Sequence, residues 1–306
     1  MKGDVVMTKL YSDFCSYLTD KKKTSENTLA SYQRDVKNFL IYLQYLGINS
    51  IDLVDISVIE QYTSNLKKEK KSASTISRNL SSLRCFFKYL VNIKIIMFNP
   101  MIGVKNEKKK ANSLPAVLNN TDVDKLLNGP DVSSVKGIRD KAMLEVLYAT
   151  GIRVSELLSI TINDINLDVG YIIINKGNIN ERAVPLYSIA IQSLTDYIKK
   201  SRPILLEKSK EKCNILFLNS LGAEMTRQGF WKIIKHYASI AEIVGDITPK
   251  TLRHSFATHL LENGADINIL KDMLGHRTVS STKVYTKILK NKYQSVYENC
   301  HPRAKR

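Results

Sequence analysis

A segment without hydrophobic periodicity interrupts the chain well before its midpoint. It reads NPMIGVKNEKKKANSLPAVLN, with Pro100 and Pro115 near its ends and three consecutive lysines between them. Prolines flanking a polar, aperiodic stretch are typical of a connection between domains, not of a helix or strand. The sequence therefore predicts two domains, residues 1–105 and 119–306, joined by a linker at 106–118. The 306 residues are enough for each domain to bury its own hydrophobic core.

The first domain has the apolar spacing of helices. In KLYSDFCSYL the apolar residues recur at the spacing of one helical face. Three more helices are predicted, in ENTLASYQRDVKNFLIYLQYLG, after Asp55, and in TISRNLSSLRCFFKYLV. Ser25 and Asp55 fit the N-caps of the second and third helices, and Gly47 fits the end of the second. Ser72 or Ser74 fits the N-cap of the fourth. Four such helices predict a small bundle.

The second domain mixes helices with two short strands. GIRDKAMLEVLYATG predicts an amphipathic helix that Gly151 ends. GYIIIN and ERAVPL are typical of strands and are joined by the turn KGNIN, and helices return from Ser188 onward. The predicted fold class is therefore mainly α with a small antiparallel β-sheet, in two domains.

The charge of the chain points to an anionic partner. There are 46 basic and 29 acidic side chains, which gives a formal net charge of +17. Such an excess repels itself in a compact fold and is most easily explained by a polyanion. Nucleic acid is the leading candidate. An anionic membrane surface, or a basic protein without such a partner, is the alternative.

Several classes of protein lack their signatures in this sequence. It contains no GxxxxGK[ST] or GxGxxG loop, no HExxH and no GxSxG, so we expect no nucleotide, metal or other cofactor. The cysteines, at 15, 85, 213 and 300, form no CxxC pair, and we expect reduced thiols. No apolar run approaches the roughly 18 residues of a membrane span, and no signal peptide is apparent. The expected location is the cytoplasm, without a membrane partner.

The stretch TPKTLRHSFATHLL places two cations in the first turn of a helix. Thr248 fits the N-cap and Pro249 the first helical position. Lys250 and Arg253 follow, three residues apart, so the sequence predicts that they share a face. Positive charge there opposes the helix dipole unless an anion binds. With the free N–H groups of the helix start, the two cations would make a phosphate site. A surface pair facing carboxylates is the alternative.

Two further residues stand next to predicted helix ends, and a third lies on a predicted helix. Arg153, in ATGIRVSELLSI, lies between a helix-ending glycine and the start of a new helix. His276 follows directly after the helix in ADINILKDMLG, and Tyr285 lies on a later helix, in STKVYTK. Each has an ordinary structural explanation when taken alone: a salt bridge, a structural histidine and a packed tyrosine.

Taken together, the motifs resemble the tyrosine recombinase (phage integrase) family, and most closely its Xer-type members. The residues that carry the resemblance are, in order, Arg153 in TGIRVSEL, Lys176 in NKGNINERAVPL, Arg253 in TPKTLRHSFATHLL, His276 in LGH and Tyr285 in STKVYTK. Five motifs in this order rarely coincide by chance, and the resemblance covers the whole chain. One position departs, since the family most often has histidine where this chain has Lys250. Lysine keeps a cation and a donor but not a proton acceptor, because its ordinary pKa is about 10.4.

The resemblance implies a fold and a reaction. The first domain would be a core-binding, SAM-like bundle and the second a tyrosine recombinase catalytic domain. Tyr285 would attack a DNA phosphate, which gives a 3′-phosphotyrosine and a free 5′-hydroxyl. Arg153 and Arg253 would bind the phosphate oxygens, His276 would donate a further hydrogen bond, and Lys176 would protonate the leaving oxygen. Neither a metal nor ATP is required.

The resemblance also implies an assembly. The partner would be double-stranded DNA with paired half-sites, bound by a homo- or hetero-tetramer on two DNA sites. A C-terminal helix at about 290–306 would connect protomers, and Arg78 and Arg84 would lie on a DNA-facing helix. The expected role is Xer-type resolution of chromosome or plasmid dimers, with a cell-division DNA translocase as a further partner. A phage or transposon integrase is the alternative, and a DNA-binding protein without catalysis is the alternative from another class.

Overall fold

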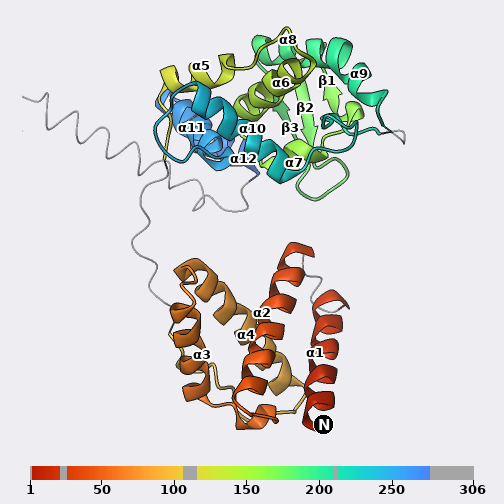
Figure 1. Ribbon diagram of the computed structural model, residues 1–306. Helices are drawn as coiled ribbons and strands as arrows, with labels where there is room; N and C mark the ends of the chain where they lie inside the picture. The colour runs from red at the N-terminus through yellow and green to blue at the C-terminus, as the bar shows by residue number, and fades with distance from the viewer. Residues whose placement is uncertain (1, 21–25, 106–115, 210–212, 276–306) are drawn as a thin grey trace, which may run out of the picture. The chain divides into compact units, whose positions relative to one another are not determined.

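The chain divides into two compact units, Met1–Asn112 and Ser113–Arg306, each with its own hydrophobic core. The computed structural model describes residues 2–20, 26–105, 116–209 and 213–275 (Figure 1). Most of the predicted linker lies outside these ranges. Leu118, at its predicted end, is buried in the core of the second unit.

The first unit is a helical bundle. Its elements are α1 (Lys2–Asp20), α2 (Glu26–Tyr45), the 3₁₀ turn η1 (Ile51–Leu53), α3 (Ile56–Lys68) and α4 (Ala73–Asn92). Its centre is aromatic: the side chains of Phe14, Phe39, Phe86 and Phe87 are fully buried. The rings of Phe14 and Phe86 meet edge to face, with centroids 5.1 Å apart, a geometry that adds to their hydrophobic contact. The predicted mainly helical first domain is confirmed.

The helix ends of the first unit follow from local hydrogen bonding. The Asp55 carboxylate accepts the N–H three residues on, at 3.1 Å, and caps α3. Ser72, and not Ser74, caps α4 in the same way at 3.2 Å. Gly47, just after α2, has a φ of 71°, which favours glycine. Ser25, the predicted cap of α2, lies outside the described residues.

The second unit gathers helices around α6, with a small sheet beside them (Figure 1). Its elements are α5 (Asn120–Asn128), α6 (Val135–Thr150), α7 (Val154–Ser159), the 3₁₀ turn η2 (Ile162–Asp164), β1 (Ile165–Asn166), β2 (Tyr171–Ile174), β3 (Arg182–Pro185), α8 (Ser188–Asp196), the π-helical η3 (Tyr197–Ser201), α9 (Arg202–Leu206), α10 (Arg227–Ile240), α11 (Pro249–Glu262) and α12 (Ile267–Leu274).

The prediction that GIRDKAMLEVLYATG forms an amphipathic helix is wrong in one respect. The helix forms, as α6, but it is buried on nearly every side. Its charged residues Arg139 and Asp140 pair with each other at 2.8 Å, and Glu145 pairs with Lys141 at 2.7 Å. The sequence pattern is misleading because charges that look like a solvated face are instead paired in the interior. Gly151 ends α6 as predicted, with a φ of 57°.

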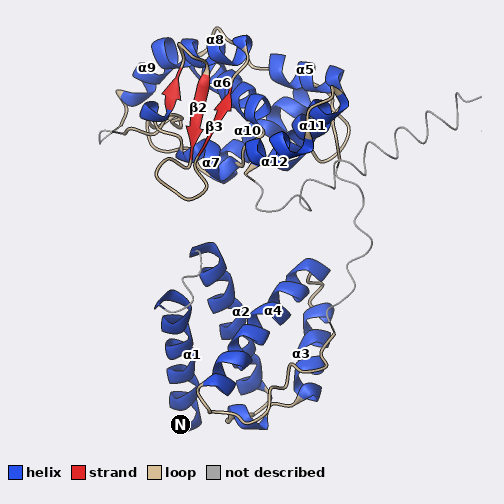
Figure 2. Cartoon of the chain, turned by 180° about the vertical axis from the view of Figure 1, so that it is seen from behind, coloured by secondary structure: helices blue, strands red, loops and turns tan. Residues whose placement is uncertain are grey.

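The sheet is antiparallel, in the order β1-β2-β3 (Figure 2). Its β2–β3 hairpin is the predicted one, and Ile174 pairs with Arg182 at the end next to the turn. The sequence does not predict β1, because two residues are too few to show alternation. The turn of the hairpin carries Lys176, so the pairing of β2 with β3 fixes where the backbone of this lysine lies.

Within the described residues, no helix combines the length and apolarity that a membrane span needs. The same residues contain no group of three or more potential metal ligands.

Candidate active site

The α11 helix gives its two cations different surroundings. Thr248 caps the helix, its hydroxyl accepting the N–H of Thr251 at 3.2 Å, and Pro249 begins it, as predicted. Lys250 is exposed, whereas Arg253 is only 8% exposed. Residues three apart differ by about 60° around a helix, which is enough here to put one in solvent and the other in the interior. The two cations thus begin the same helix, as predicted, but differ in exposure, which the sequence does not predict.

The Arg253 guanidinium joins the ends of two helices. Its Nη1 donates to the carbonyl of Gly151, at the end of α6. Its Nη2 donates to the carbonyl of Leu274, at the end of α12, at 2.8 Å. Both carbonyls belong to glycine-terminated helix ends, where the backbone leaves acceptors unpaired.

Arg153 reaches the same end of α12 from another direction. It is the N-cap of α7, as its position between two helices predicts, and its side chain is 46% exposed. Its Nη2 donates to the carbonyl of Gly275 at 3.2 Å, one residue beyond the Arg253 contact. The two arginines therefore converge on Leu274 and Gly275, which directly precede His276. Both His276 and Tyr285 lie outside the described residues.

The carboxylate of Glu156 organises this region and is absent from the sequence prediction. It is buried and accepts the backbone N–H of Arg153 at 2.8 Å and Nη2 of Arg182 at 2.9 Å. Burial raises the pKa of Glu156, but hydrogen bonds from Arg182 and Arg153, with their charges, outweigh it and lower the pKa to about 2. A sequence signal exists: in RVSE, the glutamate occupies the third helical position, where it reaches back to the cap.

Lys176 lies on the hairpin turn and is half-exposed. Its Nζ is 3.3 Å from the carbonyl oxygen of Asn163 and 4.0 Å from a carboxylate oxygen of Asp164. The preceding residue, Asn175, donates to Glu156 at 3.1 Å. The turn is therefore attached to the carboxylate that also binds Arg153, while the lysine amino group itself contacts η2.

His254 is a second residue that the sequence prediction missed. Burial lowers its pKa, and the positive charges of Lys250 and Arg253 lower it further, to about 4. Its imidazole is therefore neutral at physiological pH. The positive charges of Lys250 and Arg253, on the same helix, both oppose protonation of this imidazole.

Arg78 and Arg84, expected on a DNA-facing helix, both have partners inside the first unit. Arg78 pairs with the buried carboxylate of Asp35. Nη2 of Arg84 donates to the carbonyl of Val104 at 2.8 Å. Both contacts hold α4 to other parts of the bundle.

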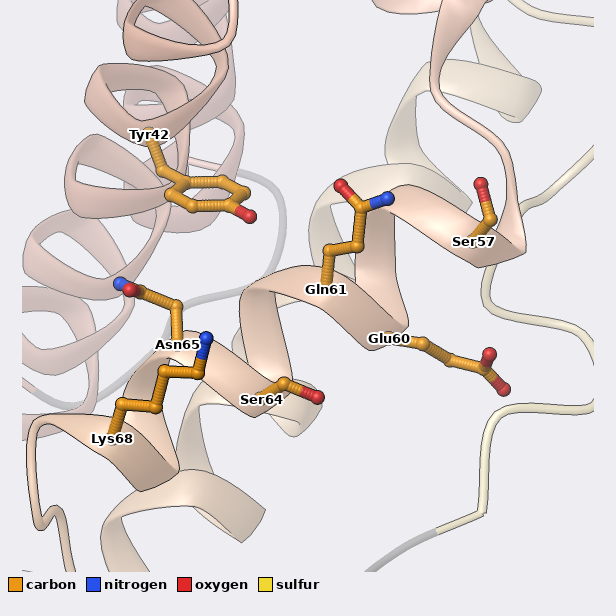
Figure 3. Close-up of a pocket in the computed structure, with 7 residues that line it drawn as sticks. All are labelled: Tyr42, Ser57, Glu60, Gln61, Ser64, Asn65 and Lys68. Carbon is orange, nitrogen blue, oxygen red and sulfur yellow. The ribbon is translucent and has the colours of Figure 1, made fainter.

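A polar hollow of about 470 Å³ lies on the first unit, between α2 and α3 (Figure 3). Tyr42 lines it from α2, and the other lining residues come from α3: Ser57, Glu60, Gln61, Ser64, Asn65 and Lys68. Glu60 and Lys68 offset each other in charge, so the hollow lacks the cationic excess that characterises the arginines of the second unit.

Comparison with known proteins defines the class. Residues 116–292 match the model of the phage integrase family, and residues 12–94 match that of the phage integrase N-terminal SAM-like domain. The chain therefore belongs to the phage integrase family.

The relatives identify the branch of the family. The chain is 42% identical over 300 residues to the tyrosine recombinase XerD of Listeria monocytogenes serotype 4b, covering 97% of this chain and 100% of the relative. It is 40% identical over 299 residues to the XerD of Staphylococcus haemolyticus, with the same coverage. The chain is thus an Xer-type site-specific DNA recombinase with a tyrosine nucleophile.

Solved structures share the fold. One is the XerH site-specific recombinase bound to a palindromic difH substrate, with a TM-score of 0.74 and 21% identity, covering 94% of this chain and 84% of that one. Another is the Tn1549 transposon integrase in complex with circular intermediate DNA, with a TM-score of 0.72 and 21% identity, covering 91% and 94%. The predicted fold class, a helical SAM-like domain followed by a recombinase catalytic domain, is confirmed.

Proposed function

We propose that this recombinase resolves chromosome or plasmid dimers, and that the end of α12 marks the position of the reacting DNA phosphate. The observation that carries the proposal is the convergence of Arg153 and Arg253 on Leu274 and Gly275. Guanidinium groups bind phosphate oxygens through charge-assisted, often bidentate hydrogen bonds, and these two approach one place from separate helices.

In the proposed reaction, the Tyr285 hydroxyl attacks the phosphorus, its proton passes to solvent, and the bond to the 5′-oxygen breaks. The DNA is left with a 3′-phosphate on tyrosine and a free 5′-hydroxyl, so a second strand can reverse the step without an energy source. Arg153 and Arg253 bind the non-bridging oxygens, where charge gathers in the transition state, and His276 donates a further hydrogen bond. Lys176, on its exposed turn, protonates the leaving oxygen.

Lys250 takes the position at which the family usually has histidine. It is exposed at the first turn of α11, beside the end of that helix where N–H groups are unpaired. There it donates a hydrogen bond and supplies positive charge, and it does not accept the tyrosine proton.

The partner is double-stranded DNA with paired half-sites. XerH and the Tn1549 integrase are bound to DNA in their structures, which supports the same partner here. The junction of α3 and α4 exposes four lysines that would contact phosphates: Lys67, Lys68, Lys70 and Lys71. Such contacts supply most of the affinity and make it depend on salt.

The assembly we propose is a homo- or hetero-tetramer on two DNA sites, in the cytoplasm. The helix that the sequence predicts at about 290–306, which lies outside the described residues, would connect the protomers, and a cell-division DNA translocase would be a further partner.

The chemistry is tested on a nicked suicide duplex, selected from a randomised library by covalent capture on the wild-type chain. Cleavage should proceed in excess EDTA without ATP. A cleavage activity that disappears in EDTA and returns with magnesium alone, while DNA binding is unchanged, contradicts the mechanism. The biological role is tested by deleting the gene: chromosome dimers should accumulate, whereas a mobile-element integrase leaves dimer frequency unchanged.

A further inference from the structure

Three arginines donate to three consecutive carbonyls at the end of α12. Nε of Arg182 donates to Met273 at 2.7 Å, Nη2 of Arg253 to Leu274 at 2.8 Å, and Nη2 of Arg153 to Gly275 at 3.2 Å. The last carbonyls of a helix have no partner within the helix and form the negative end of its dipole. The guanidinium groups therefore hold in place the residues that precede His276.

Arg182 differs from the other two arginines in its surroundings. Its side chain is 11% exposed, and its Nη1 and Nη2 donate to the two carboxylate oxygens of Glu156 at 3.1 and 2.9 Å. The guanidinium lies against Gly275, which has a φ of 62° and where an added Cβ would meet the Arg182 Cζ at 2.9 Å. Arg182 is thus enclosed between the hairpin, Glu156 and the end of α12.

The difference matters once a phosphate is bound. A DNA phosphate offers the guanidinium groups of Arg153 and Arg253 a stronger, charged acceptor than a backbone carbonyl. If they turn to it, their contacts with Leu274 and Gly275 would weaken. Arg182 is less free to turn, because its side chain is 11% exposed and two of its nitrogens already donate to the Glu156 carboxylate.

We infer that Arg182 is a positioning residue, which keeps the end of α12, and with it His276, in place while Arg153 and Arg253 engage the phosphate. This inference rests on the proposed function. It differs from a purely structural role for Arg182 in one respect: the importance of Arg182 to the end of α12 should increase when DNA binds.

Hydrogen exchange measures this directly. Exchange of the α12 amides is followed in chains carrying Tyr285→Phe, free and bound to the uncut selected duplex. Without DNA, Arg182→Ala should speed exchange at 267–275 only slightly, since Arg153 and Arg253 still hold the end of α12. With DNA bound, the acceleration caused by Arg182→Ala should be at least about tenfold larger. An equal effect of Arg182→Ala in both states overturns the inference.

Single-turnover cleavage gives the second readout, as a double-mutant cycle with His276. His276→Ala should slow cleavage by roughly 10²–10³-fold, as for the loss of one oxyanion donor. Arg182→Ala should slow it at least about tenfold, and the double variant should be no slower than His276→Ala alone. In combination with Lys176→Ala, the effects should multiply. Multiplication with His276→Ala instead would show that Arg182 does not act through His276.

Two further variants separate positioning from loss of fold. Arg182→Lys keeps a charge beside Glu156. Combined with His276→Ala, it too should give a double variant that cleaves no more slowly than His276→Ala alone. Arg202 is the matched control, since its Nη2 also donates to backbone carbonyls, of Cys213 and Ile215 at 2.8 Å. It begins α9, a different helix from α12 (Figure 1). Arg202→Ala should lower stability and leave the cleavage rate of the folded chain within about twofold of wild type. An equal loss of cleavage in Arg202→Ala and Arg182→Ala overturns the inference. Cleavage by the wild-type chain tests the proposed function separately, because every variant is expressed as a ratio to it.

Discussion

At the scale of single residues, the cations of α11 have the most contrasting environments. Arg253 is buried between two helix ends, while Lys250, one turn earlier, faces solvent. If both act on the scissile phosphate, their loss should differ in kind.

Arg253→Ala should remove roughly 3–4 kcal/mol of transition-state stabilisation, by analogy with a lost oxyanion donor, and should weaken binding of uncut DNA much less. Lys250→Ala should slow cleavage less than Arg253→Ala, and Lys250→His should retain substantial activity. Single-turnover cleavage and binding of the three variants provide the measurement. Small and similar losses in the arginine and lysine variants, confined to binding, or near-wild-type cleavage by Arg253→Ala, would contradict a role of this helix at the scissile phosphate.

His254 gives a prediction on pH dependence. Its pKa is about 4 in the folded chain and 6.5 in the unfolded chain. The unfolded state therefore binds more protons between these values, and stability falls as pH falls from 6.5 towards 4. Denaturant midpoints across this window should fall less steeply in His254→Asn than in wild type. Parallel pH profiles for the two chains would show that His254 does not titrate as described.

At the scale of elements, the sequence predicts what depends on neighbours along the chain. The caps at Asp55, Ser72 and Thr248 are local hydrogen bonds, and the hairpin around Lys176 follows from strand-forming residues on either side of a turn. The sequence also locates Arg153 and Arg253 through the motifs that contain them.

What the sequence does not predict depends on contacts far apart in the chain. The α6 helix looks amphipathic because the partners of its charges cannot be read from spacing. Glu156 has a local signal as the capping glutamate of α7, but its pairing with Arg182, and the contact of Arg182 with Met273, arise only where α7, β3 and the end of α12 meet. Burial of Arg253 is a further example.

Gly151, which ends α6 at a positive φ, gives a prediction on the stability of the fold. A Cβ at Gly151 would lie 2.1 Å from the ring of Phe256, whereas Gly264, also at positive φ, has nothing within 4 Å. Gly264→Ala should cost about 1 kcal/mol from backbone strain alone. Gly151→Ala should cost about 2–5 kcal/mol, because overpacking adds to the strain. Equal losses in denaturant unfolding would mean that Phe256 yields without cost.

At the scale of the whole molecule, recombination needs several protomers that assemble on paired DNA half-sites. From Lys287 the sequence reads KILKNKYQSVYENCHPRAKR, and this segment is expected to connect protomers. Deletion from Asn291 should leave both units folded and weaken cooperative binding to paired half-sites, as measured by gel shift on one and two half-sites. Unchanged cooperativity in the truncated chain would assign the connection to another segment.

The nucleophile can be identified on the covalent complex itself. The wild-type chain is trapped on the nicked duplex, denatured and digested, and the peptide that carries the DNA 3′-phosphate is sequenced by mass spectrometry. We predict that the nucleotide is attached to Tyr285, and that Tyr285→Phe binds the duplex without forming an adduct. Attachment to Tyr293, Tyr297 or any other residue, or an adduct that survives denaturation in Tyr285→Phe, would contradict the account.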